Sequence, residues 1–246
     1  MLYAERQAKV GDYELRYTEA GDGETLVWLP GGGGLHTTAG TDLLTRSFRV
    51  VALELPGFGS SVERDTARSF DELSEQVADG IQALGLKEYV LHGTSFGGAT
   101  ALHLALNNPE RVTRLILESP VAFRPQGWTP PDLETMRRGL YLHPERARRV
   151  EIDPGVQLRQ REFVGRLSLA VDRDALATRL RDLHVPMLVM FGEADLLVPP
   201  EMARMYTDHA PACESVVIPD AGHAVSSDQP EAYADAILEF AANQTV

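Results

Sequence analysis

The sequence contains only one cysteine, Cys213, in 246 residues. An intramolecular disulfide is therefore excluded, and a metal site built from cysteines is not expected. Cys213 opens an apolar run that we expect to be a buried strand, and no catalytic residue types surround it. We interpret it as a structural thiol that behaves like a small apolar side chain.

Long apolar runs are also missing. No stretch of about 18 or more apolar residues occurs, so the sequence predicts no membrane-spanning helix and no membrane partner. The first ten residues carry Glu5, Arg6 and Lys9 and lack the apolar core of a secretory signal. We therefore expect a cytoplasmic protein.

Positive charge is scarce as well. Lys9 and Lys87 are the only lysines, and the formal net charge is -13. Nucleic acid is not an expected partner, because its binding needs a basic surface. Hydrophobic residues make up 43% and charged residues 24%, which is typical of a globular protein, and the length suits one large domain.

Short apolar runs alternate with helical segments along the chain. We expect strands at 13–19, 25–29, 48–55, 89–91, 113–117, 185–191 and 215–218. Most of these runs lack strict polar–apolar alternation, which is typical of parallel strands buried on both faces. The order predicts an α/β fold with a doubly wound, mostly parallel sheet of about eight strands.

Helix boundaries can be read between the strands. Ser69 and Glu72 form a capping box at the start of one helix, and Gly85 ends it. Asp228 and Glu231 repeat this start signal before the last helix.

One segment breaks the alternation, because no strand is predicted between residues 121 and 182. We interpret 121–182 as a helical cap inserted into a core formed by 1–120 and 183–246. Residues 131–182 hold 11 Arg against 9 Asp plus Glu. This balance fits helix faces with paired charges better than it fits a cap that attracts an anionic substrate.

The strongest functional motif is the run from Gly93 to Gly98, with Ser95 at its centre. It follows a predicted buried strand and precedes a predicted helix, which is the context of a nucleophile elbow. The tight turn exposes the Ser95 hydroxyl, and the backbone N–H of Phe96 lies at the helix N-terminus, where negative charge is stabilised.

A serine nucleophile needs a base. Of the seven histidines, His223 lies between the last strand and the final helix, at the same sheet edge as Ser95. His36 lies near a glycine-rich loop and is expected to line the pocket. His92 is expected to pack beneath the elbow.

The base in turn needs a carboxylate partner. Asp195 follows a strand, and the order Ser95, Asp195, His223 is that of α/β-hydrolases. Glu193 is a weaker candidate because it lies closer to the strand. Glu118 ends the strand after the elbow helix, and our hypothesis is that it lines the pocket or anchors the cap.

A second oxyanion donor is expected from the glycine run after Pro30. We predict the N–H of Gly32, with Gly31 and Gly33 beside the substrate. No Lys and no Gly-Lys-Ser or Gly-Lys-Thr end follows, so a phosphate-binding loop is not indicated. The further residues that we expect in the substrate pocket are Phe123, Trp128, Met136, Tyr141 and Leu197.

Together these motifs resemble the α/β-hydrolase fold family over nearly the whole chain. The resemblance also rests on the stretches 54–61 and 192–199. It departs from the family where Pro30 stands in place of a usual His and Glu54 in place of a usual Asp. The resemblance implies a serine hydrolase of a small-molecule ester or lactone, with no metal and no organic cofactor.

Two other functions remain open. Hydrolases that cleave carbon–carbon bonds of diketone ring-fission products share a stretch similar to 95–102, but they usually carry Trp where Ala224 follows His223. A ligand receptor on the same fold would turn over its signal very slowly. Multiple turnover separates the receptor from an enzyme.

Overall fold

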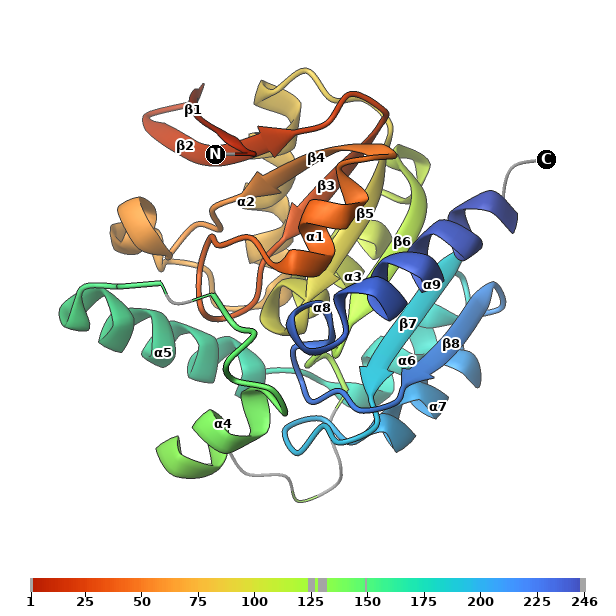
Figure 1. Ribbon diagram of the computed structural model, residues 1–246. Helices are drawn as coiled ribbons and strands as arrows, with labels where there is room; N and C mark the ends of the chain where they lie inside the picture. Colours follow the sequence, from red (N-terminus) through yellow and green to blue (C-terminus); the bar gives the residue numbers. More distant parts are fainter. Residues whose placement is uncertain (1, 124–126, 128–131, 149, 244–246) are drawn as a thin grey trace.

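The computed structural model describes residues 2–123, 127, 132–148 and 150–243. Its centre is an eight-stranded sheet in the order β1-β2-β4-β3-β5-β6-β7-β8 (Figure 1). The first two strands pair antiparallel, β2 pairs antiparallel with β4, and all other neighbours are parallel. The expected α/β fold with a mostly parallel sheet is confirmed.

The strands are β1 (Ala4–Val10), β2 (Tyr13–Ala20), β3 (Glu24–Leu29), β4 (Phe48–Leu53), β5 (Tyr89–Thr94), β6 (Val112–Glu118), β7 (Met187–Gly192) and β8 (Cys213–Ile218). The α-helices are α1 (Ala39–Leu44), α2 (Phe70–Ala83), α3 (Ser95–Asn107), α4 (Leu133–Leu140), α5 (Pro154–Leu169), α6 (Arg173–Leu180), α7 (Arg204–Thr207), α8 (Val225–Asp228) and α9 (Pro230–Asn243). Short 3₁₀ turns are η1 (Gly59–Arg64), η2 (Pro109–Arg111) and η3 (Pro200–Ala203).

Two apolar cores cover the two faces of the sheet. Within β3, Val27 and Leu29 join the core with α2, α3 and α6, whereas Leu26 and Trp28 join the core with α1, α8 and α9. This is the two-residue alternation of a strand with both faces buried. Figure 1 shows α1 and α9 in front of the sheet and α2 and α3 behind it.

The segment 121–182 divides into two parts. In Figure 1, α4 and α5 lie beyond the carboxyl ends of the parallel strands, while α6 lies beside β7. Leu176 and Leu180 of α6 are buried in the core of the sheet. We propose that the cap ends before α6, so that it is shorter than 121–182.

Three local expectations differ from the structure. The strand β1 was not predicted, because its sequence is polar and exposed; it forms by hairpin pairing with β2. The strand β8 is not buried but lies at the sheet edge, with Val217 44% exposed. Asp228 does not cap α9, because its carboxylate binds backbone N–H groups elsewhere.

The helix α2 begins much as expected. Ser69 accepts a hydrogen bond from the backbone N–H of Glu72, but the Glu72 carboxylate accepts from Arg68 N rather than from Ser69 N. Only half of the capping box therefore forms. Gly85 follows the helix with φ +73°, which is the left-handed conformation of a helix end.

Candidate active site

The strand β5 and the helix α3 meet at Ser95, whose φ is 54°. A Cβ on Gly93 would lie 2.4 Å from the carbonyl oxygen of Gly97, and one on Gly97 would lie 2.0 Å from that of Leu29. Both positions therefore require glycine. The close packing of strand and helix holds the strained turn that presents the Ser95 side chain at the sheet edge.

His223 connects Ser95 to Asp195. Its Nε2 lies 2.8 Å from Ser95 Oγ, and its Nδ1 lies 2.8 Å from Asp195 Oδ2. His223 is 3% exposed and Asp195 is 5% exposed. The structure thus brings the three residues together in hydrogen-bond contact, in the arrangement that a serine, base and acid need.

The loop after β7 fixes the Asp195 carboxylate. Its Oδ1 accepts hydrogen bonds from the backbone N–H groups of Leu197, at 2.8 Å, and Val198, at 2.9 Å. These bonds leave Oδ2 aimed at His223. Glu193, the alternative acid, is exposed.

Charge and burial act in opposite directions on His223. Burial alone would lower the pKa of the imidazole, but the charge and hydrogen bond of Asp195, together with the charge of Glu118, raise that pKa above its usual 6.5. The net effect stabilises the imidazolium. A base that must take up a proton from serine gains from this arrangement.

Glu118 lies beneath the site at the end of β6 and has no exposed surface. Its Oε1 accepts a 2.7 Å hydrogen bond from Ser226 N, and its Oε2 accepts a 2.8 Å bond from the hydroxyl of Thr94. The Thr94 oxygen in turn accepts from Trp28 Nε1 at 3.1 Å. Burial raises the pKa of Glu118, whereas these bonds and the charge of His223 lower it in part.

The glycine run after β3 forms a turn beside Ser95. The N–H of Gly34 donates to the carbonyl of Gly31 at 3.0 Å. A Cβ on Gly31 would lie 3.3 Å from Ser95 Cβ, while Gly32 and Gly33 are exposed. His36 Nδ1 lies 2.8 Å from the Gly34 carbonyl, and burial lowers the pKa of this imidazole, so it braces the turn as a neutral donor.

The other expected pocket residues have mixed positions. Phe123 is fully buried and packs edge-on against Tyr206 with ring centroids 5.0 Å apart, so the structure gives it a packing role. Met136 and Tyr141 are half-buried in and after α4. Leu197 packs against α4, because a Cβ on Gly139 would lie 2.8 Å from its Cδ2. Trp128 lies outside the described residues.

Burial, followed by the charges of Glu118 and Asp228, raises the pKa of Tyr141. Tyr141 lies beside the loop that carries His223, because a Cβ on Gly222 would lie 3.4 Å from the Tyr141 carbonyl carbon. This position supports its expected place in the pocket.

Arginines of the cap and of α6 donate hydrogen bonds to residues outside the segment 121–182. Five arginines between residues 146 and 179 donate to carboxylates or carbonyls outside the segment 121–182. Arg148, Arg159 and Arg179 form ion pairs with Asp42, Glu63 and Asp71, respectively. Arg146 and Arg166 donate instead to the backbone carbonyls of Asp228 and Asp65. The three ion pairs support the interpretation of these arginines as paired charges.

Three non-glycine residues in the described part of the chain have φ in the left-handed region. They are Ser95, Ser119 with 44° and Asp220 with 54°. Each follows the carboxyl end of a strand, namely β5, β6 or β8. Strained backbone concentrates at functional sites, which supports this sheet edge as the site.

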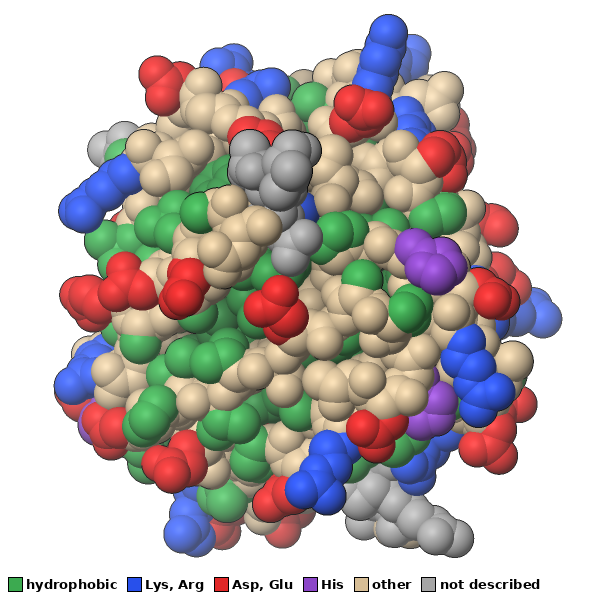
Figure 2. All heavy atoms as spheres, turned by 90° about the vertical axis from the view of Figure 1, so that its right-hand side faces the viewer, with side chains coloured by type: hydrophobic (Ala, Val, Ile, Leu, Met, Phe, Trp, Pro, Cys, Tyr) green, Lys and Arg blue, Asp and Glu red, His purple; other side chains and the backbone are tan. Residues whose placement is uncertain are grey.

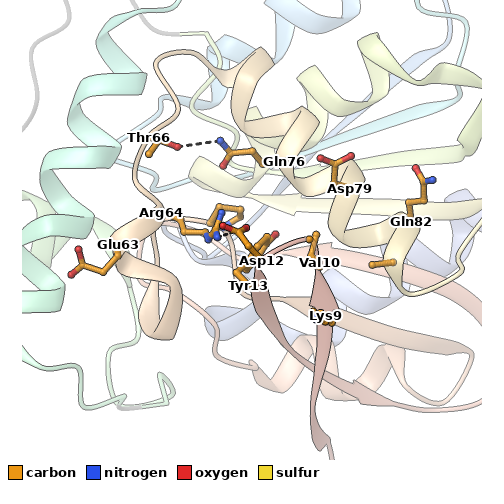
Figure 3. Close-up of a pocket in the computed structure, with 13 residues that line it drawn as sticks. Lys9, Val10, Asp12, Tyr13, Glu63, Arg64, Thr66, Gln76, Asp79 and Gln82 are labelled. Atoms are coloured by element: carbon orange, nitrogen blue, oxygen red, sulfur yellow. Dashed lines mark hydrogen bonds and ion pairs between the residues drawn. The ribbon is translucent and has the colours of Figure 1, made fainter.

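A separate surface cavity of about 830 Å³ lies between the β1–β2 turn, η1 and α2 (Figure 3). Arg64 stacks over the ring of Tyr13 at 4.2 Å and pairs with Asp12 at 2.6 Å. Neither Ser95 nor His223 lines this cavity. Its lining mixes charges of both signs, so we assign no chemistry to it.

Within the described ranges, no three His, Cys, Asp or Glu side chains are grouped as metal ligands would be. On the face of the molecule that Figure 2 shows, Lys and Arg side chains are scattered among Asp and Glu and form no single basic patch. No described helix is both long enough and apolar enough to cross a bilayer.

The profile of the alpha/beta hydrolase family matches residues 26–236, and the chain belongs to this family. It is 31% identical over 261 residues to a pimeloyl-[acyl-carrier protein] methyl ester esterase of Yersinia enterocolitica, covering 93% of this chain and 97% of that one. It is 27% identical over 272 residues to 2-hydroxy-6-oxo-6-(2'-aminophenyl)hexa-2,4-dienoic acid hydrolase of Metapseudomonas resinovorans, with 97% and 91% covered.

Solved structures agree with this assignment. A serine hydrolase involved in carbazole degradation, the CarC enzyme, superposes with a TM-score of 0.76 at 25% identity and covers 98% of this chain and 99% of that one. The epoxide hydrolase CorEH superposes with a TM-score of 0.78 at 21% identity and covers 98% and 99%. The latter likeness shows the fold alone.

Proposed function

We propose that the protein is a serine hydrolase that cleaves a carboxylic ester or lactone through an acyl-enzyme on Ser95. The observation that carries this proposal is the pair of 2.8 Å contacts that join Ser95, His223 and Asp195 at the sheet edge. The esterase relatives support an ester as the bond cleaved.

The proposed reaction has two steps. In the first, His223 Nε2 takes the proton from Ser95 Oγ as this oxygen attacks the substrate carbonyl carbon, and the C=O electrons move onto the oxygen. The imidazolium then gives the proton to the leaving alcohol, and the acyl group remains on Ser95. In the second step, His223 takes a proton from water as the water oxygen attacks the acyl carbon. The imidazolium then returns the proton to Ser95 Oγ as the bond to the acyl group breaks and the acid leaves.

The backbone N–H groups of Gly32 and Phe96 are the proposed oxyanion donors. Phe96 lies in the first turn of α3, where N–H groups have no partner within the helix. Gly32 is exposed in the turn beside Ser95. Removal of one such donor typically raises the barrier by about 3 kcal/mol.

A carbon–carbon hydrolase is the second candidate. It is favoured by the relative from Metapseudomonas resinovorans and by the CarC structure. Ala224, where such enzymes usually carry Trp, weighs against it. A substrate of this class would be a vinylogous diketone.

The test compares hydrolysis of p-nitrophenyl esters from acetate to decanoate by the wild type and by Ser95→Ala, with a vinylogous diketone in parallel. Sustained ester turnover that is lost in Ser95→Ala is the expected result. Activity that survives the substitution would refute the triad. Turnover of the diketone alone would support the carbon–carbon hydrolase, and a stall after one equivalent would support a receptor.

A further inference from the structure

Gln160 is a buried polar side chain on α5 with unused hydrogen-bonding capacity. Only 2% of the residue is exposed, and its Oε1 has no hydrogen-bond partner within the described part of the chain. Its helix neighbours Phe163 and Leu167 are buried and apolar. Because an unpaired buried amide is unfavourable, such a group in a folded protein calls for an explanation.

The side chain lies against the glycine turn of the site. A Cβ on Gly34 would lie 3.3 Å from Gln160 Nε2, and one on Gly32 would lie 3.4 Å from Val164, one helical turn along α5. At the other end of the turn, Gly31 abuts Ser95. The ends of such a turn are less than about 7 Å apart. Gln160 and the nucleophile therefore lie against opposite ends of the same glycine turn.

We propose that Gln160 is a substrate-recognition residue and that the substrate carries a hydroxyl group near the carbonyl that Ser95 attacks. This inference rests on the proposed function. A hydroxyl both donates and accepts, so it can pair with either end of the amide. A neutral amide at this place matches a neutral hydroxyl better than it matches a carboxylate, for which arginine gives two charged bonds.

The substrate class that follows is a hydroxylated ester or lactone rather than an unsubstituted hydrocarbon ester. The amide lies beside the turn that carries the proposed Gly32 donor, so it reaches the part of the substrate that runs along this turn. Because only 2% of Gln160 is exposed, the amide has little freedom to move. Its hydrogen bond is therefore directional, and it discriminates by the position of the hydroxyl as well as by its presence.

The test measures binding without turnover. Two intact esters of equal chain length, one with a hydroxyl next to the carbonyl and one without, are titrated calorimetrically into Ser95→Ala, alone and combined with Gln160→Met. Methionine keeps the length of the side chain but removes its polar ends. Gln157→Met makes the same change on an exposed position of the same helix and serves as the control.

The hydroxylated ester should bind about tenfold more tightly when Gln160 is present, and Gln160→Met should remove this preference without weakening the other ester. Gln157→Met should change neither affinity. Because the Gln160 oxygen has no partner among the described residues, Gln160→Met should not lower the melting temperature. If this double variant does not fold, Gln160→Asn replaces it and should weaken the preference.

Equal binding of the two esters, or binding of neither, would overturn the assignment of Gln160. An equal loss for both esters in Gln160→Met would show a packing role and would overturn it as well. These outcomes are independent of the esterase assay, in which survival of activity in Ser95→Ala refutes the nucleophile rather than the recognition residue.

Discussion

Glu118 accepts a 2.7 Å hydrogen bond from the backbone N–H of Ser226, three residues beyond His223. The end of β6 thereby holds the loop that carries the proposed base. The two oxygens of the Glu118 carboxylate accept separate hydrogen bonds, one from Ser226 N and one from the Thr94 hydroxyl. These bonds favour the ionised carboxylate and oppose the effect of burial, which raises its pKa.

Substitution Glu118→Gln should shift the pH profile. The charge of Glu118 contributes to the raised pKa of His223, so its removal lowers that pKa. His223 must be neutral to act as a base, so the rise of kcat/KM with pH should move to lower pH. At the optimum, kcat should fall less than about tenfold, because Glu118 does not contact the ring. An unchanged profile would mean that Glu118 carries no charge at the assay pH.

Substitution Asp195→Asn should have a far larger effect on kcat. Asp195 Oδ2 lies 2.8 Å from His223 Nδ1, and an amide at this place holds the ring in the wrong tautomer. The expected loss is roughly 1,000- to 10,000-fold at neutral pH. Steady-state rates of this variant and of Glu118→Gln show which of the two carboxylates is the catalytic partner of His223. Near-wild-type activity in Asp195→Asn, with a large loss in Glu118→Gln, would reverse their roles.

The carboxylate of Asp228 links the cap to the loop that carries His223. Its buried carboxylate accepts hydrogen bonds from the N–H groups of Gly222, Leu142 and His143 at 2.8 to 2.9 Å. Asp228→Asn would leave at least one donor facing the amide nitrogen, and we expect a loss of about 3 kcal/mol in the free energy of unfolding. Chemical denaturation measures this loss.

Asp220→Asn is the matched control for this prediction. Asp220 is an acid of the same loop, its side chain is 61% exposed, and it pairs with His143. Exposed pairs of this kind contribute little, so the control should change stability by less than about 1 kcal/mol. Equal free energies of unfolding for the two variants would contradict the proposed role of Asp228 in linking the cap to this loop.

Cys213 should be chemically inert in the folded protein. Cys213 is partly buried at the start of β8, where it packs against the core. This burial raises the pKa of its thiol to about 12, so very little thiolate is present at pH 8. We expect iodoacetamide to label it slowly in the native protein and quickly after unfolding, with no loss of hydrolase activity. Rapid native labelling followed by mass spectrometry would contradict this prediction.

The sequence predicted those elements whose local pattern agrees with their burial in the folded protein. The strands β3 to β7 are apolar runs bounded by turn residues. Ser95 follows β5, Asp195 follows β7, and His223 follows the edge strand β8. Their contact follows from the rule that carboxyl ends of parallel strands share one edge. Whether these residues act as a triad stays a prediction until variants are assayed.

The remaining features depend on contacts between distant segments. The sequence around Asp228 is typical of the N-terminal capping residue of a helix. In the structure, its carboxylate instead accepts hydrogen bonds from the backbone N–H groups of Leu142 and His143, in the inserted segment. Gln160 has no local signal at all, because its position matters only where α5 meets the turn at Gly34. The polar strand β1 forms because β2 offers it a partner, and not because of an apolar pattern of its own.

The most direct test of the account is covalent trapping of the nucleophile. The protein is incubated with a p-nitrophenyl alkylphosphonate, and its mass, its modified peptide and its residual hydrolysis of a p-nitrophenyl ester are followed together. The account predicts one adduct per chain, located on Ser95, that forms in parallel with inactivation and is absent from Ser95→Ala. Inactivation by an adduct on another residue, or full activity with Ser95 modified, would contradict it.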